Sequence, residues 1–362
     1  TIVGQLYKPG DVRIDSGYTI FYMSINIGSM LGFLVCGYLG EKVGWHWGFG
    51  AAGVGMTFGV LQYLFTRNSL GEAGKNANLA PTEDESKYMN IFKYSAIAIF
   101  LLVTSGFAGL WSVDPQLLNQ LTVYLILIVA ISYFIYLFFF AGLGTDEIEN
   151  IKMLLLLFFG AVLFWAGFDQ GGSSLNLFAK DYTDLFIFGW EMPATFLQVA
   201  NPLMVVIFAP FFAAFWISLG KKNLDPDTPQ KFALGCFLMA IGFLVIIFGV
   251  EAAMQNEKAG IQFLLITYLF HTLGELCLSP VGLSATAKYS PIRYRGQMMG
   301  IWFLSSSLAA GLAGLLASKS FEAGIASMPD LFMQIIIALF VVGILLLISN
   351  RFLKATEIKE GN

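Results

Sequence analysis

Charged side chains are scarce in this chain of 362 residues. Asp, Glu, Lys and Arg together make up 12% of it, whereas soluble globular proteins carry about 25%. A chain so poor in charge cannot cover a water-facing surface, and its net charge of −4 excludes the basic footprint of a nucleic-acid-binding protein. Hydrophobic residues instead make up 57%, and the mean hydropathy is +0.72. This composition indicates a membrane protein.

Motifs for catalysis and for metal binding are also missing. The three cysteines, Cys36, Cys236 and Cys277, lie in apolar stretches without CxxC or Cys/His spacing, so they are predicted to be small core residues. The sequence contains no nucleophile with a matching base, no phosphate loop and no dinucleotide fingerprint. We therefore expect neither an enzyme nor a cofactor, and no use of ATP.

Long apolar segments dominate what is present. A helix that spans a bilayer needs about 20 mostly apolar residues. These runs lack the alternation of barrel strands and are too long for them. The sequence predicts ten spanning helices, at residues 18–40, 46–66, 91–111, 119–141, 152–178, 193–219, 230–252, 261–287, 296–318 and 330–353.

The distribution of positive charge predicts the topology. When successive loops are assigned to alternate sides, one side receives only Lys42, Lys180, Lys258 and Lys319, and the other receives the remaining 16 of the 20 basic residues. Cytoplasmic loops carry the excess of Lys and Arg in membrane proteins. The side with 16 is therefore predicted to be cytoplasmic, and the carboxy terminus lies on it.

Two features concern the organisation of the chain. Residues 67–90 form the longest polar segment and are predicted to be a cytoplasmic linker between two membrane halves. At the amino end, Thr1 is not an initiator Met, and residues 1–7 resemble the tail of a helix whose body lies upstream. We expect the chain to be a fragment of a longer protein.

Asp169 stands alone in a long apolar segment. A charged side chain at mid-bilayer costs roughly 2.5 to 3.5 kcal/mol on translocon scales, so such residues usually face a cavity and carry function. Trp165 one turn before it and Ser173 one turn after it share its predicted helix face, and a structural acid bonded to a neighbouring helix is the alternative. Further polar residues extend along the same predicted helix: Gln170, Ser174 and Asn176.

Glu275 is the second isolated acid. His271 lies one turn before it and Ser279 one turn after it, and Pro280 is expected to break the backbone hydrogen-bond ladder and kink the helix. A broken helix beside an acid near mid-membrane is a recurring design of transporter substrate sites. A carboxylate there suits a cationic group such as an ammonium. His271 either tunes Glu275 or is a packed, hydrogen-bonded histidine.

Three further residues have two interpretations each. Asn26 and Asn201 are amides in apolar helices, which either contact a peptide backbone or tie two helices together. Asn201 precedes Pro202 and could instead satisfy a carbonyl that the proline leaves free. Trp302 either walls a cavity or packs in the core, and the residues alone favour packing.

At these residues the sequence resembles the proton-dependent oligopeptide transporter family of the major facilitator superfamily. The resemblance follows the family order along nearly the whole chain. It rests on seven stretches: DVRIDSGYTIFYMSINIGS, WHWGFGAAGVGM, FWAGFDQGGSSLNLFA, QVANPLMVVIFAPFFAAFW, KFALGCFLMAIGF, HTLGELCLSPVGLSA and RGQMMGIWFL.

The resemblance implies roles for the matching residues. Asp169 corresponds to the protonatable carboxylate of the family's helix 7, and Glu275 to the glutamate of helix 10 that receives the amino terminus of the peptide. Asn26 and Asn201 correspond to asparagines of helices 5 and 8 that contact the peptide backbone. The remaining matches line the same cavity: Trp165, Ser279 and Trp302.

The resemblance also implies a domain division. The ExxER motif of helix 1 and the lysine of helix 4 are absent, and the latter would fall just before Thr1. The expected fold is an all-α transmembrane fold of the major facilitator type that lacks helices 1–4. Its parts are 1–66 (the end of helix 4 and helices 5 and 6), the linker 67–90, an inserted two-helix hairpin at 91–151 and a six-helix bundle at 152–362.

The implied function of the full-length parent is proton-coupled symport of di- and tripeptides by alternating access, in the cytoplasmic membrane of a bacterium. Its partners would be peptides, protons and the lipid bilayer. Two alternatives stay open: a transporter of the same fold for another small solute such as nitrate, and a non-transporting scaffold or remnant in which Asp169 and Glu275 only hold helices together.

Overall fold

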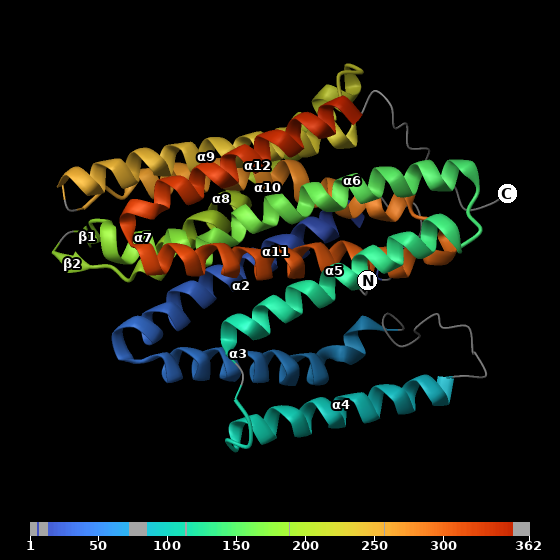
Figure 1. Ribbon diagram of the computed structural model, residues 1–362, viewed down its shortest axis with the longest axis horizontal. Helices are drawn as coiled ribbons and strands as arrows, with labels where there is room; N and C mark the ends of the chain where they lie inside the picture. Colours follow the sequence, from blue (N-terminus) through green and yellow to red (C-terminus); the bar gives the residue numbers. More distant parts are fainter. Residues whose placement is uncertain are drawn as a thin grey trace. The chain divides into compact units, whose positions relative to one another are not determined.

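The computed structural model describes residue 6 and residues 14–71, 85–112, 114–187, 189–256 and 258–349, and these residues are almost entirely helical (Figure 1). Short 3₁₀ segments and one π-helical turn, Leu39–Val43, join several of the helices. The α-helices are α2 (Ile14–Tyr38), α3 (Trp45–Thr66), α4 (Glu85–Phe107), α5 (Pro115–Phe139), α6 (Thr145–Phe168), α7 (Ser174–Tyr182), α8 (Ala200–Lys221), α9 (Thr228–Asn256), α10 (Gln262–Tyr289), α11 (Arg295–Ala323) and α12 (Met328–Ser349).

Ten of the described helical segments are long and apolar enough to cross a membrane, and each overlaps one predicted span. The prediction of an all-helical membrane protein is therefore confirmed. Residues 72–84 of the predicted linker and residues 350–353 of the last predicted span lie outside the described residues, as do the helix tail expected at the amino end and the carboxy terminus.

The predicted helix 152–178 is wrong in one respect, because it is not continuous. α6 ends at Phe168, Asp169–Gly172 form a 3₁₀ helix, and α7 begins at Ser174. Two adjacent glycines fall in the interruption, and glycine disfavours the helix interior by about 1 kcal/mol relative to alanine. The structure thus places the helix break directly at the isolated acid.

Pro280 lacks the N–H for one bond of the helical ladder, as expected, but it does not interrupt its helix. α10 runs as one α-helix from Gln262 to Tyr289 with Pro280 inside it. Membrane helices tolerate proline because neighbouring helices and local adjustments satisfy the backbone groups that it frees. The broken helix next to an acid is therefore that of Asp169, while Glu275 lies on an uninterrupted helix.

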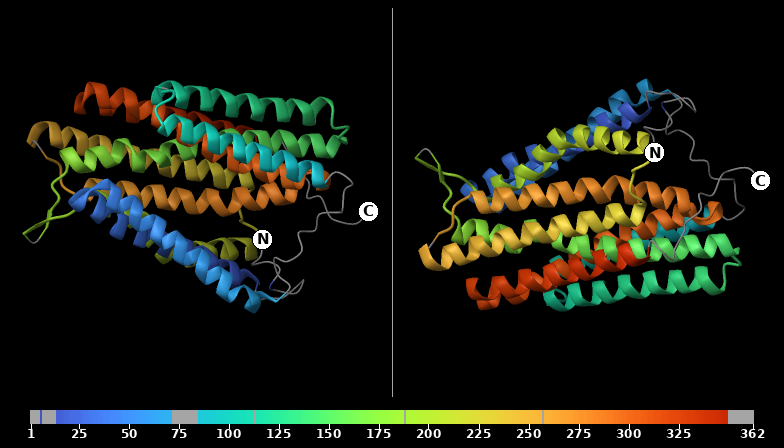
Figure 2. Two further views of the ribbon diagram at one scale, coloured as in Figure 1. Left: turned by 90° about the horizontal axis from the view of Figure 1, so that it is seen from below. Right: turned by 90° about the horizontal axis from the view of Figure 1, so that it is seen from above.

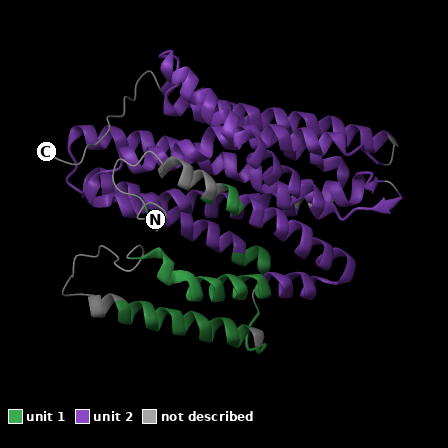
Figure 3. Ribbon diagram, turned by 180° about the vertical axis from the view of Figure 1, so that it is seen from behind, with its two compact units in different colours: residues 1–25, 53–118 green, residues 26–52, 119–362 purple. Residues whose placement is uncertain are grey.

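The chain divides into two compact units (Figure 3), one with residues 1–25 and 53–118 and the other with residues 26–52 and 119–362. In the described part of the first unit, the side chains of α4 are largely exposed and apolar, as those of Phe92, Phe100 and Leu101 show. Apolar side chains on the outside suit a helix that faces lipid rather than water.

The second unit contains the core. Within it, α9 packs against α10 and α12, α6 packs against α11 and α12, and α8 lies against α10 (Figures 1 and 2). Where α9 crosses α10, Gly235 faces Gly274, and a Cβ on Gly274 would come within 2.7 Å of the Gly235 carbonyl oxygen. Only glycine allows this approach. The largest fully buried side chains are aromatic: Phe164, Phe178, Phe232, Phe243 and Phe332.

One end of this unit is held together by polar contacts around the π-helical turn. The Glu41 carboxylate accepts hydrogen bonds from the backbone N–H groups of Ala194 (3.0 Å) and Thr195 (2.9 Å). These residues open the 3₁₀ helix Ala194–Val199 that precedes α8. A two-residue hairpin, β1 (Phe186–Ile187) with β2 (Trp190–Glu191), leads into this segment. Glu41 therefore caps the helical entry to α8.

Candidate functional site

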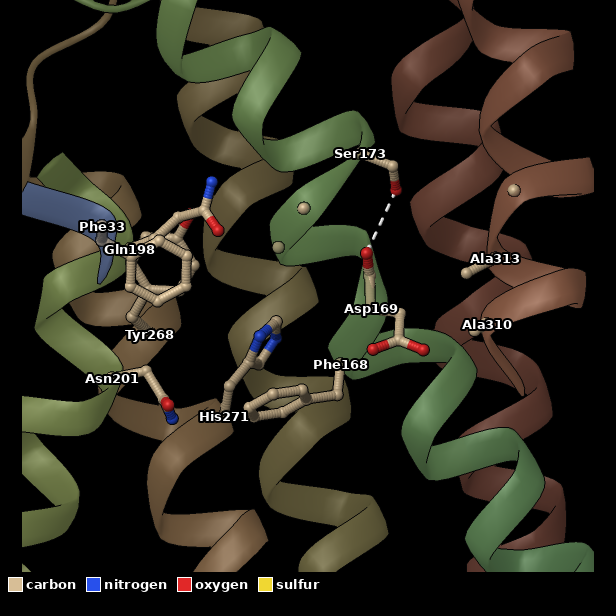
Figure 4. A pocket seen from close by; sticks show the side chains of 13 residues that line it. Phe33, Phe168, Asp169, Ser173, Gln198, Asn201, Tyr268, His271, Ala310 and Ala313 are labelled. Atoms are coloured by element: carbon tan, nitrogen blue, oxygen red, sulfur yellow. Dashed lines mark hydrogen bonds between the residues drawn. The ribbon is translucent and has the colours of Figure 1, made fainter. Parts of the chain in front are cut away.

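A cavity of about 460 Å³ opens in the second unit (Figure 4). This volume lies within the range of about 300 to 1,000 Å³ that is typical of small-molecule sites. The residues that line it belong to α2, the break between α6 and α7, the start of α8, α10 and α11. The lining residues are Phe33, Phe168, Asp169, Gly171, Gly172, Ser173, Gln198, Asn201, Tyr268, His271, Ala310, Ala313 and Gly314.

Asp169 reaches the cavity from the end of α6. Its backbone carbonyl accepts a hydrogen bond of 3.2 Å from Ser173 Oγ. Among the described residues, no hydrogen bond or ion pair engages its carboxylate. Gly171 and Gly172 contribute only backbone to the wall next to it, which leaves room for a ligand. Asp169 is thus an accessible acid in an otherwise mostly apolar wall.

The polar stripe predicted around Asp169 divides into two faces. Gln170 is fully buried, donates to the Ala313 carbonyl of α11 at 3.4 Å and accepts a hydrogen bond of 2.6 Å from Ser174 Oγ. It therefore holds the break against α11 and does not line the cavity. Asn176 accepts a hydrogen bond of 3.1 Å from Gln198, which does line the cavity.

Asn201 connects the cavity to Glu275. Its amide nitrogen donates to Glu275 Oε2 at 2.9 Å and to Thr272 Oγ1 at 3.0 Å. Glu275 is 9% exposed and lies on α10, two turns after Tyr268. The other interpretation was that Asn201 only satisfies a carbonyl freed by Pro202. The structure does not support it, because the amide of Asn201 donates its hydrogen bonds to Glu275 and Thr272.

His271 and Tyr268 bring two further polar groups to the α10 wall of the cavity. Both side chains are buried, with exposed fractions of 2% and 4%. Within the described part of the chain, neither His271 Nε2 nor the Tyr268 hydroxyl meets a partner at hydrogen-bond geometry. The His271 ring packs against Phe243 at 4.8 Å between centroids, with the two ring planes tilted by 45°. Buried polar groups without a protein partner are rare, and at the Tyr268 hydroxyl a ligand or water could supply the partner.

The two predicted tryptophans do not lie among the lining residues. Trp302 is buried in the core, with its ring 6.1 Å from that of Phe232 and packed directly on Gly282. Trp165 packs edge-on against Phe168 at 5.1 Å, and Phe168 is the residue that reaches the cavity. Their roles in substrate binding stay predictions.

Asn26 and Ser279 also lie outside the lining. Asn26 is buried on α2, seven residues before the lining residue Phe33 and hence on the same face of that helix. Ser279 follows Glu275 by one turn, and its buried hydroxyl meets no partner among the described residues. Their substrate contacts remain untested expectations.

Seven lining residues were not predicted: Phe33, Phe168, Gln198, Tyr268, Ala310, Ala313 and Gly314. Helical spacing contained a signal for two of them, because Tyr268 precedes Glu275 by seven residues and Gln198 precedes Asn201 by three. Among the described residues, no group of three His, Cys, Asp or Glu side chains is placed to hold a metal ion.

A family model described as the POT family matches residues 1–329. This chain belongs to the POT family. The solved structures of family members match its fold as well. The peptide transporter POT in complex with sulfate superposes with a TM-score of 0.85 at 35% identity, covering 97% of this chain and 70% of that one. A POT family transporter in complex with 5-aminolevulinic acid gives 0.82 at 27% identity. The predicted major facilitator fold is confirmed.

Curated relatives of this POT family chain include transporters named for peptides. The peptide transporter YePEPT of Yersinia enterocolitica is 35% identical over 96% of this chain. Dipeptide and tripeptide permease B of Salmonella typhimurium is 31% identical over 88% of it, and the uncharacterized transporter YclF of Bacillus subtilis is 38% identical over the same share. The chain spans 70% of the length of the first of these relatives and 63% of the other two.

Proposed function

We propose that the protein to which this chain belongs is a proton-coupled symporter of di- and tripeptides that works by alternating access. The observation that carries the proposal is one cavity that holds Asp169 and is joined through Asn201 to Glu275. Membership of the POT family and the peptide transporters among the relatives support a peptide as the substrate.

In this proposal Glu275 binds the ammonium group of the peptide. A buried carboxylate requires partners with hydrogen atoms to donate, and an ammonium offers three. Asn201 orients the carboxylate and lies at the cavity wall, so a substrate that replaces or shares its hydrogen bond reaches Glu275 from the cavity. An anion such as nitrate would find little attraction there, which argues against that alternative.

Asp169 takes the proton in the same proposal. Its carboxylate lies at a helix break, in contact with the cavity and without a partner in the described chain. A carboxylate that gains a cation in one state and loses it in another changes its proton affinity between the two states. Proton uptake at Asp169 would then bias the two-state equilibrium of the transporter.

The localisation and the division of the chain follow as further parts of the proposal. The protein is a multi-pass membrane protein. In this proposal it lies in the cytoplasmic membrane of a bacterium with its carboxy terminus in the cytoplasm, and the split of 16 basic residues against 4 supports this orientation. Residues 91–151 form an inserted hairpin between the end of the amino-terminal bundle (1–66, with its linker 67–90) and the carboxy-terminal bundle (152–362).

The test is uptake of alanyl-alanine into liposomes that contain the intact purified protein. We expect accumulation when the outside is more acidic than the lumen, and loss of accumulation when a protonophore removes the gradient. A folded protein that moves neither di- nor tripeptides under any gradient would contradict the proposal and favour the scaffold. Uptake of nitrate without uptake of peptides would favour the other transporter.

A further inference from the structure

The His271 ring is fixed in the wall of the cavity by close contacts with α9. A Cβ on Gly242 would come within 2.5 Å of Cδ2 and 2.8 Å of Nε2 of this ring. Phe243, the next residue on α9, covers the ring at 4.8 Å between centroids. The edge formed by Cδ2 and Nε2 therefore rests on the backbone at Gly242. Nδ1 lies across the ring from this edge, on the side that faces away from α9.

The surroundings of the ring also indicate which of its two nitrogen atoms carries the hydrogen atom in the neutral form. Nε2 meets no partner at hydrogen-bond geometry among the described residues, and its edge of the ring faces the backbone of α9. The backbone N–H groups of a helix interior are used within the helix, so the carbonyl oxygens are the backbone groups that can take part in a further hydrogen bond. A carbonyl accepts, so a hydrogen atom on Nε2 suits this surrounding and a lone pair does not. In that neutral form Nδ1 carries a lone pair and is a hydrogen-bond acceptor.

None of the described donors around the cavity is hydrogen-bonded to this acceptor. Both hydrogen atoms of the Asn201 amide are used by Glu275 and Thr272. The Thr272 hydroxyl donates to the Tyr268 carbonyl at 2.7 Å, and the Tyr268 hydroxyl has no hydrogen-bond partner among the described residues. In Figure 4 His271 stands between Asn201 on one side and Phe168 and Asp169 on the other. A ligand in the cavity lies next to the ring.

We propose that His271 Nδ1 accepts a hydrogen bond from the first peptide N–H of the substrate, and that Gly242 sets the position of the ring for this contact. The proposal rests on the proposed function, in which Glu275 holds the ammonium group. His271 precedes Glu275 by four residues on the same face of α10, a rise of about 6 Å. Consecutive residues of an extended peptide advance about 3.3 to 3.6 Å, and each hydrogen bond adds about 2.9 Å between a nitrogen atom and its acceptor. Two neighbouring nitrogen atoms can therefore reach two acceptors that lie about 6 Å apart.

The test compares alanyl-alanine with alanyl-lactate, in which an ester oxygen replaces the peptide N–H. Competition for uptake or binding is measured with the intact protein and with two variants. His271→Asn keeps a polar oxygen near the position of Nδ1, while His271→Leu has a similar shape and no acceptor. We expect wild type and the Asn variant to prefer the peptide by about 2- to 12-fold, and the Leu variant to lose this preference.

Gly242→Ala is the control for position, because its added methyl displaces the ring without changing its chemistry. This variant is expected to weaken the preference for the peptide although His271 is intact. A Leu variant that discriminates as well as wild type would overturn the proposal. If the wild-type protein binds neither compound, the proposed function itself is contradicted. This outcome differs from one that contradicts only the role of His271.

A second measurement uses only the wild-type protein, so it does not depend on whether the variants fold. With ¹⁵N-labelled histidine in the wild-type protein, the Nδ1 resonance of His271 should shift when alanyl-alanine is added and not when alanyl-lactate is added. Equal shifts with both compounds, or with neither while alanyl-alanine binds, would contradict a hydrogen bond from the peptide N–H.

Discussion

The amide nitrogen of Asn201 lies 2.9 Å from Glu275 Oε2, although the two residues are 74 positions apart in the chain. The same nitrogen also donates to Thr272 Oγ1. The Asn201 amide is a neutral donor that orients the carboxylate, and Asn201 itself lines the cavity. The pair therefore connects the wall of the cavity to the acid that we propose as the binding site of the ammonium group.

Removal of this donor should weaken substrate binding. For Asn201→Ala we expect the affinity for alanyl-alanine to fall about 10-fold or more, because a hydrogen bond to a charged group contributes about 1.5 to 3 kcal/mol. Thr272→Val is the matched control, since it removes the other acceptor of Asn201 and leaves Glu275 intact. A larger loss in the Val variant than in the Ala variant would show that the contact with Glu275 is not the important one.

Asp169→Asn should abolish accumulation driven by a proton gradient and retain exchange of peptide for peptide. The amide has nearly the shape of the acid and cannot carry a proton across a cycle. Asp181→Asn is the control, because Asp181 is exposed on α7 and does not line the cavity. Accumulation that still depends on the gradient in the Asp169 variant would remove this residue from proton coupling.

Glu275→Gln should abolish the preference for peptides with a free amino terminus. In the wild type, alanyl-alanine should compete for uptake far better than its N-acetyl form, since acetylation removes the charge that the carboxylate attracts. In the Gln variant the two should compete about equally. Equal competition in the wild type would show that no ammonium binds at Glu275.

Glu41→Ala should destabilise the protein by about 0.5 to 2 kcal/mol, the range of helix capping residues. The carboxylate that accepts hydrogen bonds from Ala194 and Thr195 is lost, and two N–H groups are left without it. Thermal unfolding in detergent measures the effect. The control is Glu191→Gln, which breaks the exposed ion pair of 3.5 Å with Lys42. Surface pairs contribute little, so an equal shift in the control would argue against capping.

The class of the protein and most of its helices could be predicted from local features of the sequence. Ten apolar runs predicted the ten spanning helices, because the hydropathy of about 20 residues is a local property that neighbouring segments do not change. Asp169 and Glu275 also stood out locally, since an acid in an apolar run is costly wherever the run packs.

Which polar groups meet depends on how the helices pack, and the sequence did not predict these contacts. The bond between Asn201 and Glu275 joins α8 to α10, and Trp302 lies in the core because Gly282 leaves space for its ring. The helix break also differed from expectation, at Asp169 rather than at Pro280. These features depend on contacts between helices, where one missing Cβ or one amide on another segment sets the outcome. No local pattern of residues contains that information.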